Sequence, residues 1–270
     1  MSENKILVPS DFSEASGAAI DLASMIAKKN NYGLSLLHIQ NGKSITDVED
    51  QMINIRESLK IKHNIQSDYI IQKGNIYSDI SKVACDNCYQ LMVIGTHGFK
   101  GIREKFFGAD ILKLVKTIPV PVLVAQKSYN MPEQGIKTIV FPAGSHKTFQ
   151  QNIDATVYLA KLFDAKVHIY TIDKPGTEWS DELKANIEVA KKTFDENGIA
   201  YIRVNEQASI FSVGYAKQTL QYAEKVEADL IALMSIPTKE FHYFADSDKE
   251  SLLTNQAGIP VLCTSDKKMV

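Results

Sequence analysis

Hydrophobic positions in the first half of the chain alternate between short continuous runs and helical stripes. Short apolar runs predict buried strands at residues 5–9, 34–39, 68–72, 91–94 and 120–125. Apolar residues spaced three or four apart predict helices at residues 15–30, 45–61, 76–88 and 111–116. We expect Ser13 to cap the first helix, because a serine oxygen accepts from a free N–H of the first turn. Strands alternating with helices predict an α/β fold with a doubly wound, five-stranded parallel sheet of order 3-2-1-4-5.

The second half of the chain repeats the first. Two early segments recur at an offset of 133 residues: Ile6–Pro9 as Ile139–Pro142, and Leu34–Ile39 as Val167–Ile172. Two later segments recur at an offset of 139: Leu91–Ile94 as Leu230–Leu233, and Ile118–Leu123 as Ala257–Leu262. The change of offset places a net insertion of six residues in the second copy, expected near Phe211–Leu220. We therefore expect two tandem α/β domains, residues 1–130 and residues 135–270.

Composition narrows the function classes. The chain has 270 residues, 44% hydrophobic, and a net charge of −2, which predicts a packed core and no electrostatic footprint for nucleic acid. No apolar run approaches the roughly 20 residues that span a bilayer, and no signal peptide precedes the first strand, so we expect a cytoplasmic protein without a membrane partner. Cys85 and Cys88 form a C-x-x-C at a helix end, where the dipole disfavours a thiolate, so packing is favoured over redox chemistry or zinc.

A glycine-spaced loop in the first domain is the candidate site. Gly95-Thr96-His97-Gly98 follows the fourth strand, and Gly108-Ala109-Asp110 precedes a helix. Glycine lets the backbone approach a phosphate, and a helix N-terminus favours negative charge. The spacing fits neither a Walker loop nor the dinucleotide fingerprint. In a sheet of this order ligands bind where the strand order reverses, between strands one and four, which brings Asp11 to the same crevice.

The second domain lacks these residues. Asp11 is matched by Gly144, and the glycines Gly95, Gly98 and Gly108 are matched by Met234, Pro237 and Ser247. The corresponding loop carries four acidic residues that would repel a phosphate: Glu240, Asp246, Asp248 and Glu250. The sequence therefore predicts a ligand in the first domain only.

Three segments resemble the universal stress protein family in its tandem form: Ile6–Ser16, Leu36–Ile39 and Ile118–Val124. The spacing Gly95, Gly98, Gly108 is similar to that of the ATP-binding subgroup. The resemblance implies an adenine nucleotide α-hydrolase-like fold in each half. It also implies an intrachain pseudo-dimer paired through the fifth strands, and it leaves a further homodimer open.

The resemblance also implies residue roles. Asp11 would bind adenine, Pro9 and Ser10 would line the pocket, and Ile39 would meet the base through its backbone. The ribose and phosphates would face Gly95, His97 and Gly98, and the phosphate chain would be held by Gly108 with the amides of Ala109 and Asp110. The ligand would be ATP, AMP or ADP, with Mg²⁺ an open question.

Two residues affect how tightly, and with which nucleotide, this site would bind. Ala109 departs from the family pattern by lacking a hydroxyl whose hydrogen bond would be worth about 1.5–3 kcal/mol. Asp110 would place a carboxylate beside the phosphates, or would help to hold Mg²⁺.

The leading hypothesis is an adenine-nucleotide-binding regulatory protein of the stress response. The alternatives are a slow ATPase or other adenine-nucleotide hydrolase, and a ligand-free assembly scaffold. Phosphate chemistry would draw on residues of the loop: His97, Lys100, Arg103 and Asp110. No catalytic or metal-ligand constellation is evident in the sequence, and His97 and His38 are both interpreted as structural, so no catalytic residue or metal ligand is assigned.

Overall fold

A computed structural model describes residues 4–40, 45–86, 89–96, 108–128, 132, 134–173, 175–208, 215–236 and 245–267. The strands of the N-terminal half are β1 (Lys5–Pro9), β2 (Gly33–Gln40), β3 (Ser67–Lys73), β4 (Tyr89–Thr96) and β5 (Val122–Gln126). Its helices are α1 (Glu14–Asn30), α2 (Ile45–His63), α3 (Ile76–Asp86) and α4 (Gly108–Val115). Strand β5 starts two residues later than predicted, because Pro121 has no N–H to give to the sheet.

The C-terminal half has the same succession of elements. Its strands are β6 (Thr138–Pro142), β7 (Lys166–Asp173), β8 (Tyr201–Gln207), β9 (Leu230–Met234) and β10 (Val261–Thr264). Its helices are α5 (Gln150–Phe163), α6 (Asp181–Glu196), α7 (Tyr215–Lys225) and α8 (Asp246–Leu253). Most of the insertion lies earlier than expected, since two residues (74 and 75) join β3 to α3 whereas seven (208–214) join β8 to α7. Tyr215–Leu220, part of the predicted insertion, belongs to α7.

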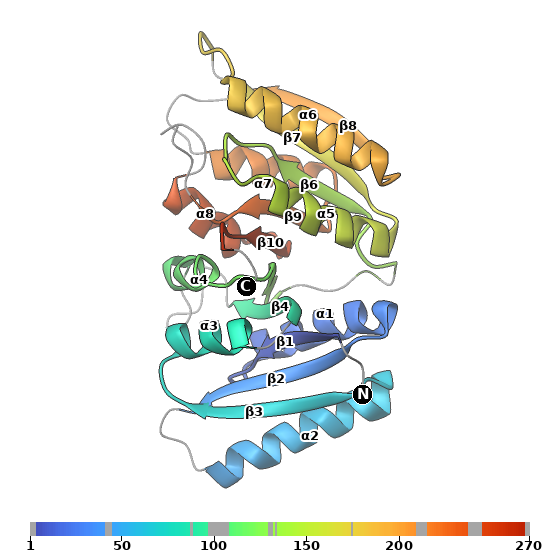
Figure 1. Cartoon of the computed structure of the whole chain (residues 1–270), viewed down its shortest axis with the longest axis vertical. Helices are drawn as coiled ribbons and strands as arrows, with labels where there is room; N and C mark the ends of the chain where they lie inside the picture. The colour runs from blue at the N-terminus through green and yellow to red at the C-terminus, as the bar shows by residue number, and fades with distance from the viewer. Residues whose placement is uncertain are drawn as a thin grey trace.

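A single sheet of ten described strands runs through both halves (Figure 1), in the order β3-β2-β1-β4-β5-β10-β9-β6-β7-β8. Each half therefore has the predicted order 3-2-1-4-5. The two halves join where β5 pairs antiparallel with β10, with Leu123 opposite Leu262, and the other pairings are parallel. The predicted pairing of the fifth strands is thus confirmed.

Helices cover both faces of this sheet and bury two hydrophobic clusters. One cluster lies under α1, α2, α5 and α6, with Leu22 and Phe163 among its members. The other lies under α3, α4, α7 and α8 and includes Leu112 and Leu253. Helices α4 and α8 pack on each other across the joint between the halves. Burying a leucine such as Leu112 of α4 or Leu253 of α8 stabilises the fold by about 1.5–3 kcal/mol. The joint between the halves is therefore part of the hydrophobic core.

Among the helices that the structure describes, none has the length and apolar character needed to cross a membrane.

Candidate functional site

The turn between β1 and α1 is held by hydrogen bonds from its own residues. The Ser10 N–H donates to the Leu37 carbonyl of β2 at 2.8 Å. The Ser13 hydroxyl accepts from the Ser16 N–H at 3.3 Å, which confirms Ser13 as the cap of α1. Asp11, exposed at the carboxyl end of β1, accepts from the Ser13 N–H at 3.0 Å through Oδ1. The Asp11 carboxylate is therefore oriented by its own turn.

Phe12 and His38 support this turn from beneath. Phe12 has a φ of 67°, in the left-handed region that costs a bulky residue about 1–2 kcal/mol. Its ring stacks on that of His38, with 4.7 Å between the ring centroids. His38 Nδ1 lies 2.8 Å from the Ser10 carbonyl oxygen, and because a carbonyl can only accept, Nδ1 donates. His38 thus has the structural role expected of it.

Gly95 is required by packing at the end of β4. A Cβ added there would lie 2.0 Å from the Ala15 carbonyl oxygen and 2.3 Å from its carbon, so no side chain fits. Leu7 of β1 is opposite Met92 of β4, so continuing this register places Gly95 level with Ser10. Glycine is explained here by the close approach of α1 to β4, a reason that the sequence analysis did not give.

The first turn of α4 is formed by Gly108, Ala109 and Asp110, and the N–H groups of such a turn have no partner within the helix. The Tyr77 hydroxyl of α3 interacts with the Asp110 carboxylate. Burial, followed by this interaction and by the Asp110 charge, raises the pKa of Tyr77 to about 12. The N-terminus of α4 therefore carries a carboxylate that interacts with a neighbouring helix.

The structure brings the predicted residues of β1, β2 and β4 to one edge of the sheet. Pro9 ends β1, Ser10 and Asp11 follow it, and Ile39 and Gly95 each lie one residue before the end of their strands. Carboxyl ends of neighbouring parallel strands share an edge, as predicted. Several predicted residues lie outside the described residues: His97, Gly98, Lys100 and Arg103, and likewise Cys88.

No role was predicted from the sequence for three further residues near this edge: Phe12, Tyr77 and Thr96. Nothing in the hydrophobic pattern signals the positive φ of Phe12 or the contact of Tyr77 with Asp110. Thr96 stands in the glycine loop, and the structure buries it completely, with no hydrogen-bond partner for Oγ1 within the described chain.

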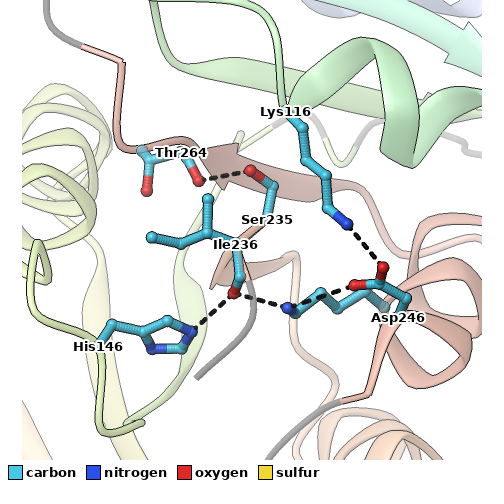
Figure 2. Close-up of polar contacts among 7 residues, drawn as sticks. Lys116, His146, Ser235, Ile236, Asp246 and Thr264 are labelled. Atoms are coloured by element: carbon cyan, nitrogen blue, oxygen red, sulfur yellow. Dashed lines mark hydrogen bonds and ion pairs between the residues drawn. The ribbon is translucent and has the colours of Figure 1, made fainter. Parts of the chain in front are cut away.

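The equivalent edge of the C-terminal half is bridged by side chains (Figure 2). Ile236 lies two residues after β9, and its carbonyl oxygen accepts from His146 Nε2 at 3.0 Å and from Lys249 Nζ at 2.6 Å. His146 comes from the β6–α5 connection and Lys249 from α8. The bond from His146 crosses the position between β6 and β9 that corresponds to the crevice between β1 and β4, and Lys249 reaches the same carbonyl from α8. At the offset of 139, Lys249 replaces Asp110.

The bridging groups are deeply buried. Lys249 has no exposed side-chain surface, and this burial lowers its pKa to about 8. Burial, with the nearby Lys249 charge, lowers the pKa of His146 to about 4, so its ring is neutral at pH 7. Asp246 Oδ1 is 3.9 Å from Lys249 Nζ, while Asp246 Oδ2 pairs at 2.7 Å with Lys116, the residue after α4.

Within the described ranges, no group of three or more His, Cys, Asp or Glu residues is placed to hold a metal ion.

Comparisons with known proteins agree with this fold. Residues 3–126 match the model of the universal stress protein family. The universal stress protein YxiE of Bacillus subtilis is 26% identical over 146 residues, which cover 46% of this chain and 99% of YxiE. A universal stress protein structure from Archaeoglobus fulgidus superposes with a TM-score of 0.72 at 17% identity, covering 98% of this chain and 99% of that one. The functionally unknown PA1789 from Pseudomonas aeruginosa superposes with a TM-score of 0.59 at 15% identity, covering 97% and 92%. At these identities the two structures establish the fold alone.

Proposed function

We propose, from the premise that this chain belongs to the universal stress protein family through residues 3–126, that it binds one adenine nucleotide, in its N-terminal domain. One observation carries the proposal. Ser10, Asp11 and Gly95 lie at the carboxyl ends of β1 and β4, where the strand order reverses, and α4 is the helix that follows β4 in the chain. Ligands of open α/β sheets bind at such a place.

The nucleotide would lie across this edge with its base toward β1 and β2. The Asp11 carboxylate accepts from the exocyclic amine of adenine, beside Pro9, Ser10 and the backbone of Ile39. The ribose and phosphates then face the glycine loop (Gly95, His97 and Gly98). The phosphate chain meets the free N–H groups at Gly108, Ala109 and Asp110, where the helix dipole favours an anion.

Asp110 bears on which nucleotide is preferred. Its carboxylate interacts with Tyr77 and belongs to the first turn of α4, beside the expected phosphates. Like charges close to each other repel, so ATP would need Mg²⁺ to offset the repulsion, whereas AMP carries less charge. We therefore expect Mg²⁺ to strengthen ATP binding more than AMP binding.

The C-terminal half supports the proposal by contrast. Its equivalent crevice is crossed by the bond from His146 to the Ile236 carbonyl, which also accepts from Lys249. Met234 replaces Gly95, and its side chain is buried at the end of β9. A nucleotide would have to displace these contacts. The role in the stress response and the cytoplasmic location stay predictions from the sequence.

The test of the N-terminal site is Asp11→Ala, with Asp21→Ala as its control. Asp21 is an exposed aspartate of α1, so both variants remove one charge from the same region. Calorimetric titration of Asp11→Ala should show ATP affinity reduced about ten- to a hundredfold, the value of one charge-assisted hydrogen bond. Pyrophosphate affinity should stay unchanged in both variants, because Asp11 offers phosphate no donor. Equal losses for ATP and pyrophosphate would show that Asp11 does not read the base.

A further inference from the structure

A groove lies at the opposite edge of the N-terminal half, where β1, β2 and β3 begin. Its volume of about 630 Å³ is within the range of small-molecule sites. It is lined by the first residues of these strands (Lys5, Gly33 and Ser67) and by one face of α2. Figure 1 shows α2 running along the outer end of the sheet beside β3. Because parallel strands begin at one edge and end at the other, this groove is separate from the proposed nucleotide site.

Arg56 of α2 reaches the groove with most of its donors unused. Its Nε donates to the Ser67 carbonyl at 3.1 Å, and the guanidinium carbon lies 5.4 Å from the centroid of the Tyr69 ring. A guanidinium has five N–H donors in a planar fork, and the bond to Ser67 uses one of them. Its side chain makes no other hydrogen bond within the described part of the chain. The two Nη groups are therefore oriented by the protein and available to an anion.

Two neighbours of Arg56 on α2 also line the groove. Lys60 lies one turn further along the helix, and its ammonium forms no ion pair with any residue that the structure describes. Ile53 lies one turn earlier and remains 39% exposed. This face of the helix thus presents an apolar surface, then a guanidinium fork, and then an ammonium.

The charges that line the groove do not cancel. Lys5 pairs with Asp68, which neutralises both. The other charged side chains of the lining are Arg56, Lys60 and Glu57, two cations and one anion. The groove therefore carries one net positive charge, which complements a ligand with a single negative charge.

The C-terminal half does not repeat this arrangement. At the offset of 135 that aligns the buried positions of α2 and α6, Arg56 matches Lys191 and Lys60 matches Asp195. Lys191 is already paired with Glu188 of its own helix at 2.9 Å. The fold itself therefore does not require two unpaired cations at this place.

We propose that this groove binds a small monocarboxylate with an apolar body. The carboxylate accepts charge-assisted hydrogen bonds from the Nη groups of Arg56 and from Lys60. The hydrocarbon part lies on Ile53 and removes its exposed surface from water. A polyphosphate fits less well, because its further charges would meet Glu57 without a matching cation.

The alternative is that these cations serve the helix alone. Lys60 and Lys62 stand in the last turn of α2, where the helix dipole favours positive charge. In that case no carboxylate binds at this edge, and Lys60 and Lys62 are equivalent. Lys62 is exposed and does not line the groove, so it provides the matched control.

The experiment is a titration of the full chain with octanoate, followed by amide chemical shifts in NMR spectra. The amides of Gly33, Leu34 and Ser67 should shift to saturation. Acetate lacks the tail and octylammonium has the opposite charge, so both should need concentrations at least about tenfold higher. The titration is run with and without ATP and Mg²⁺, and the two results should agree because the sites lie at opposite edges. Failure of nucleotide binding would therefore leave the result interpretable.

Variants locate the ligand. Arg56→Gln should weaken octanoate binding about tenfold, because it removes the charged fork. Lys62→Gln removes the same charge outside the groove and should bind as the wild type does. Ile53→Ser should also weaken binding, whereas Ile61→Ser, at an isoleucine of α2 outside the groove that is 81% exposed, should not.

Three results would overturn the proposal. One is octanoate binding that Arg56→Gln leaves unchanged, and another is equal saturation by octylammonium. The third is a set of shifts that leaves out the amides at the groove, because the ligand would then lie elsewhere. If Arg56→Gln does not fold, Lys60→Gln takes its place, with the same expected loss and the same control.

Discussion

The two halves share a fold but differ at the point where strand order reverses. In the N-terminal half, four residues (10–13) join β1 to α1, and Gly95 lets the helix begin against β4. In the C-terminal half, seven residues (143–149) join β6 to α5, and Met234 stands in place of Gly95. Helix α1 is capped by Ser13, whereas Phe149 gives α5 no side-chain cap. Where Met234 replaces Gly95, the following helix α5 thus starts three residues later than α1 does in the N-terminal half.

The charges at the two edges differ as well. The first turn of α4 carries Asp110, which interacts with Tyr77, while the same position of α8 directs Lys249 into the interior. The first edge is bordered by an exposed aspartate and glycines, and the second is crossed by bonds to Ile236. The comparison shows that duplication preserved the sheet and its packing while each edge acquired its own chemistry.

Gly95→Ala tests the close approach of α1 most severely. The added methyl would meet the Ala15 backbone at 2.0 Å, and backbone cannot yield as a flexible side chain does. We expect a loss of about 3 kcal/mol in the free energy of unfolding, the upper end for overpacking, together with loss of nucleotide binding. Gly17→Ala adds the same methyl in α1 with nothing within 4 Å, and should stabilise by about 0.5–1 kcal/mol. Urea unfolding measures both, and a Gly95→Ala protein of wild-type stability would contradict the packing described.

The buried Lys249 of the C-terminal half should make the stability of the protein depend on pH. Its pKa is about 8 in the folded chain against 10.5 for an ordinary lysine, so between these values the unfolded chain binds more protons. Stability contributed by this group therefore rises as pH increases from 8 to 10.5, by up to about 3 kcal/mol. Denaturant unfolding at several pH values should show this rise in the wild type relative to Lys249→Met. Parallel pH profiles for the two proteins would show that Lys249 is not desolvated.

Ala109→Ser should strengthen ATP binding in the N-terminal half, and this effect is smaller than the two above. The added hydroxyl restores one hydrogen bond to a phosphate in the first turn of α4, which should tighten ATP binding roughly tenfold. The matched control is Ser247→Ala, at the corresponding turn of the C-terminal half, which should leave ATP affinity unchanged. Calorimetric titration compares the two, and weaker binding by Ala109→Ser would show that the α4 turn does not hold the phosphates.

The fold could be predicted from the sequence because each signal acts locally. Apolar runs such as Leu91–Ile94 and the constant offsets between the halves fix the strands, their order and the tandem repeat. The edge residues were predicted for the same reason, since carboxyl ends of parallel strands must meet. Contacts between distant side chains carry no such signal. The bonds of His146 and Lys249 to Ile236, and the interaction of Tyr77 with Asp110, became visible through the tertiary structure.

The central claim is that one of the two similar edges holds a nucleotide. Its most direct test is the stoichiometry of ATP binding with Mg²⁺, measured by calorimetry on the full chain, with hydrogen exchange locating the protected amides. The account predicts one ATP per chain, with protection in the β1–α1 turn and the first turn of α4. Two equivalent sites, no binding, or protection confined to the β6–α5 connection and α8 would contradict it.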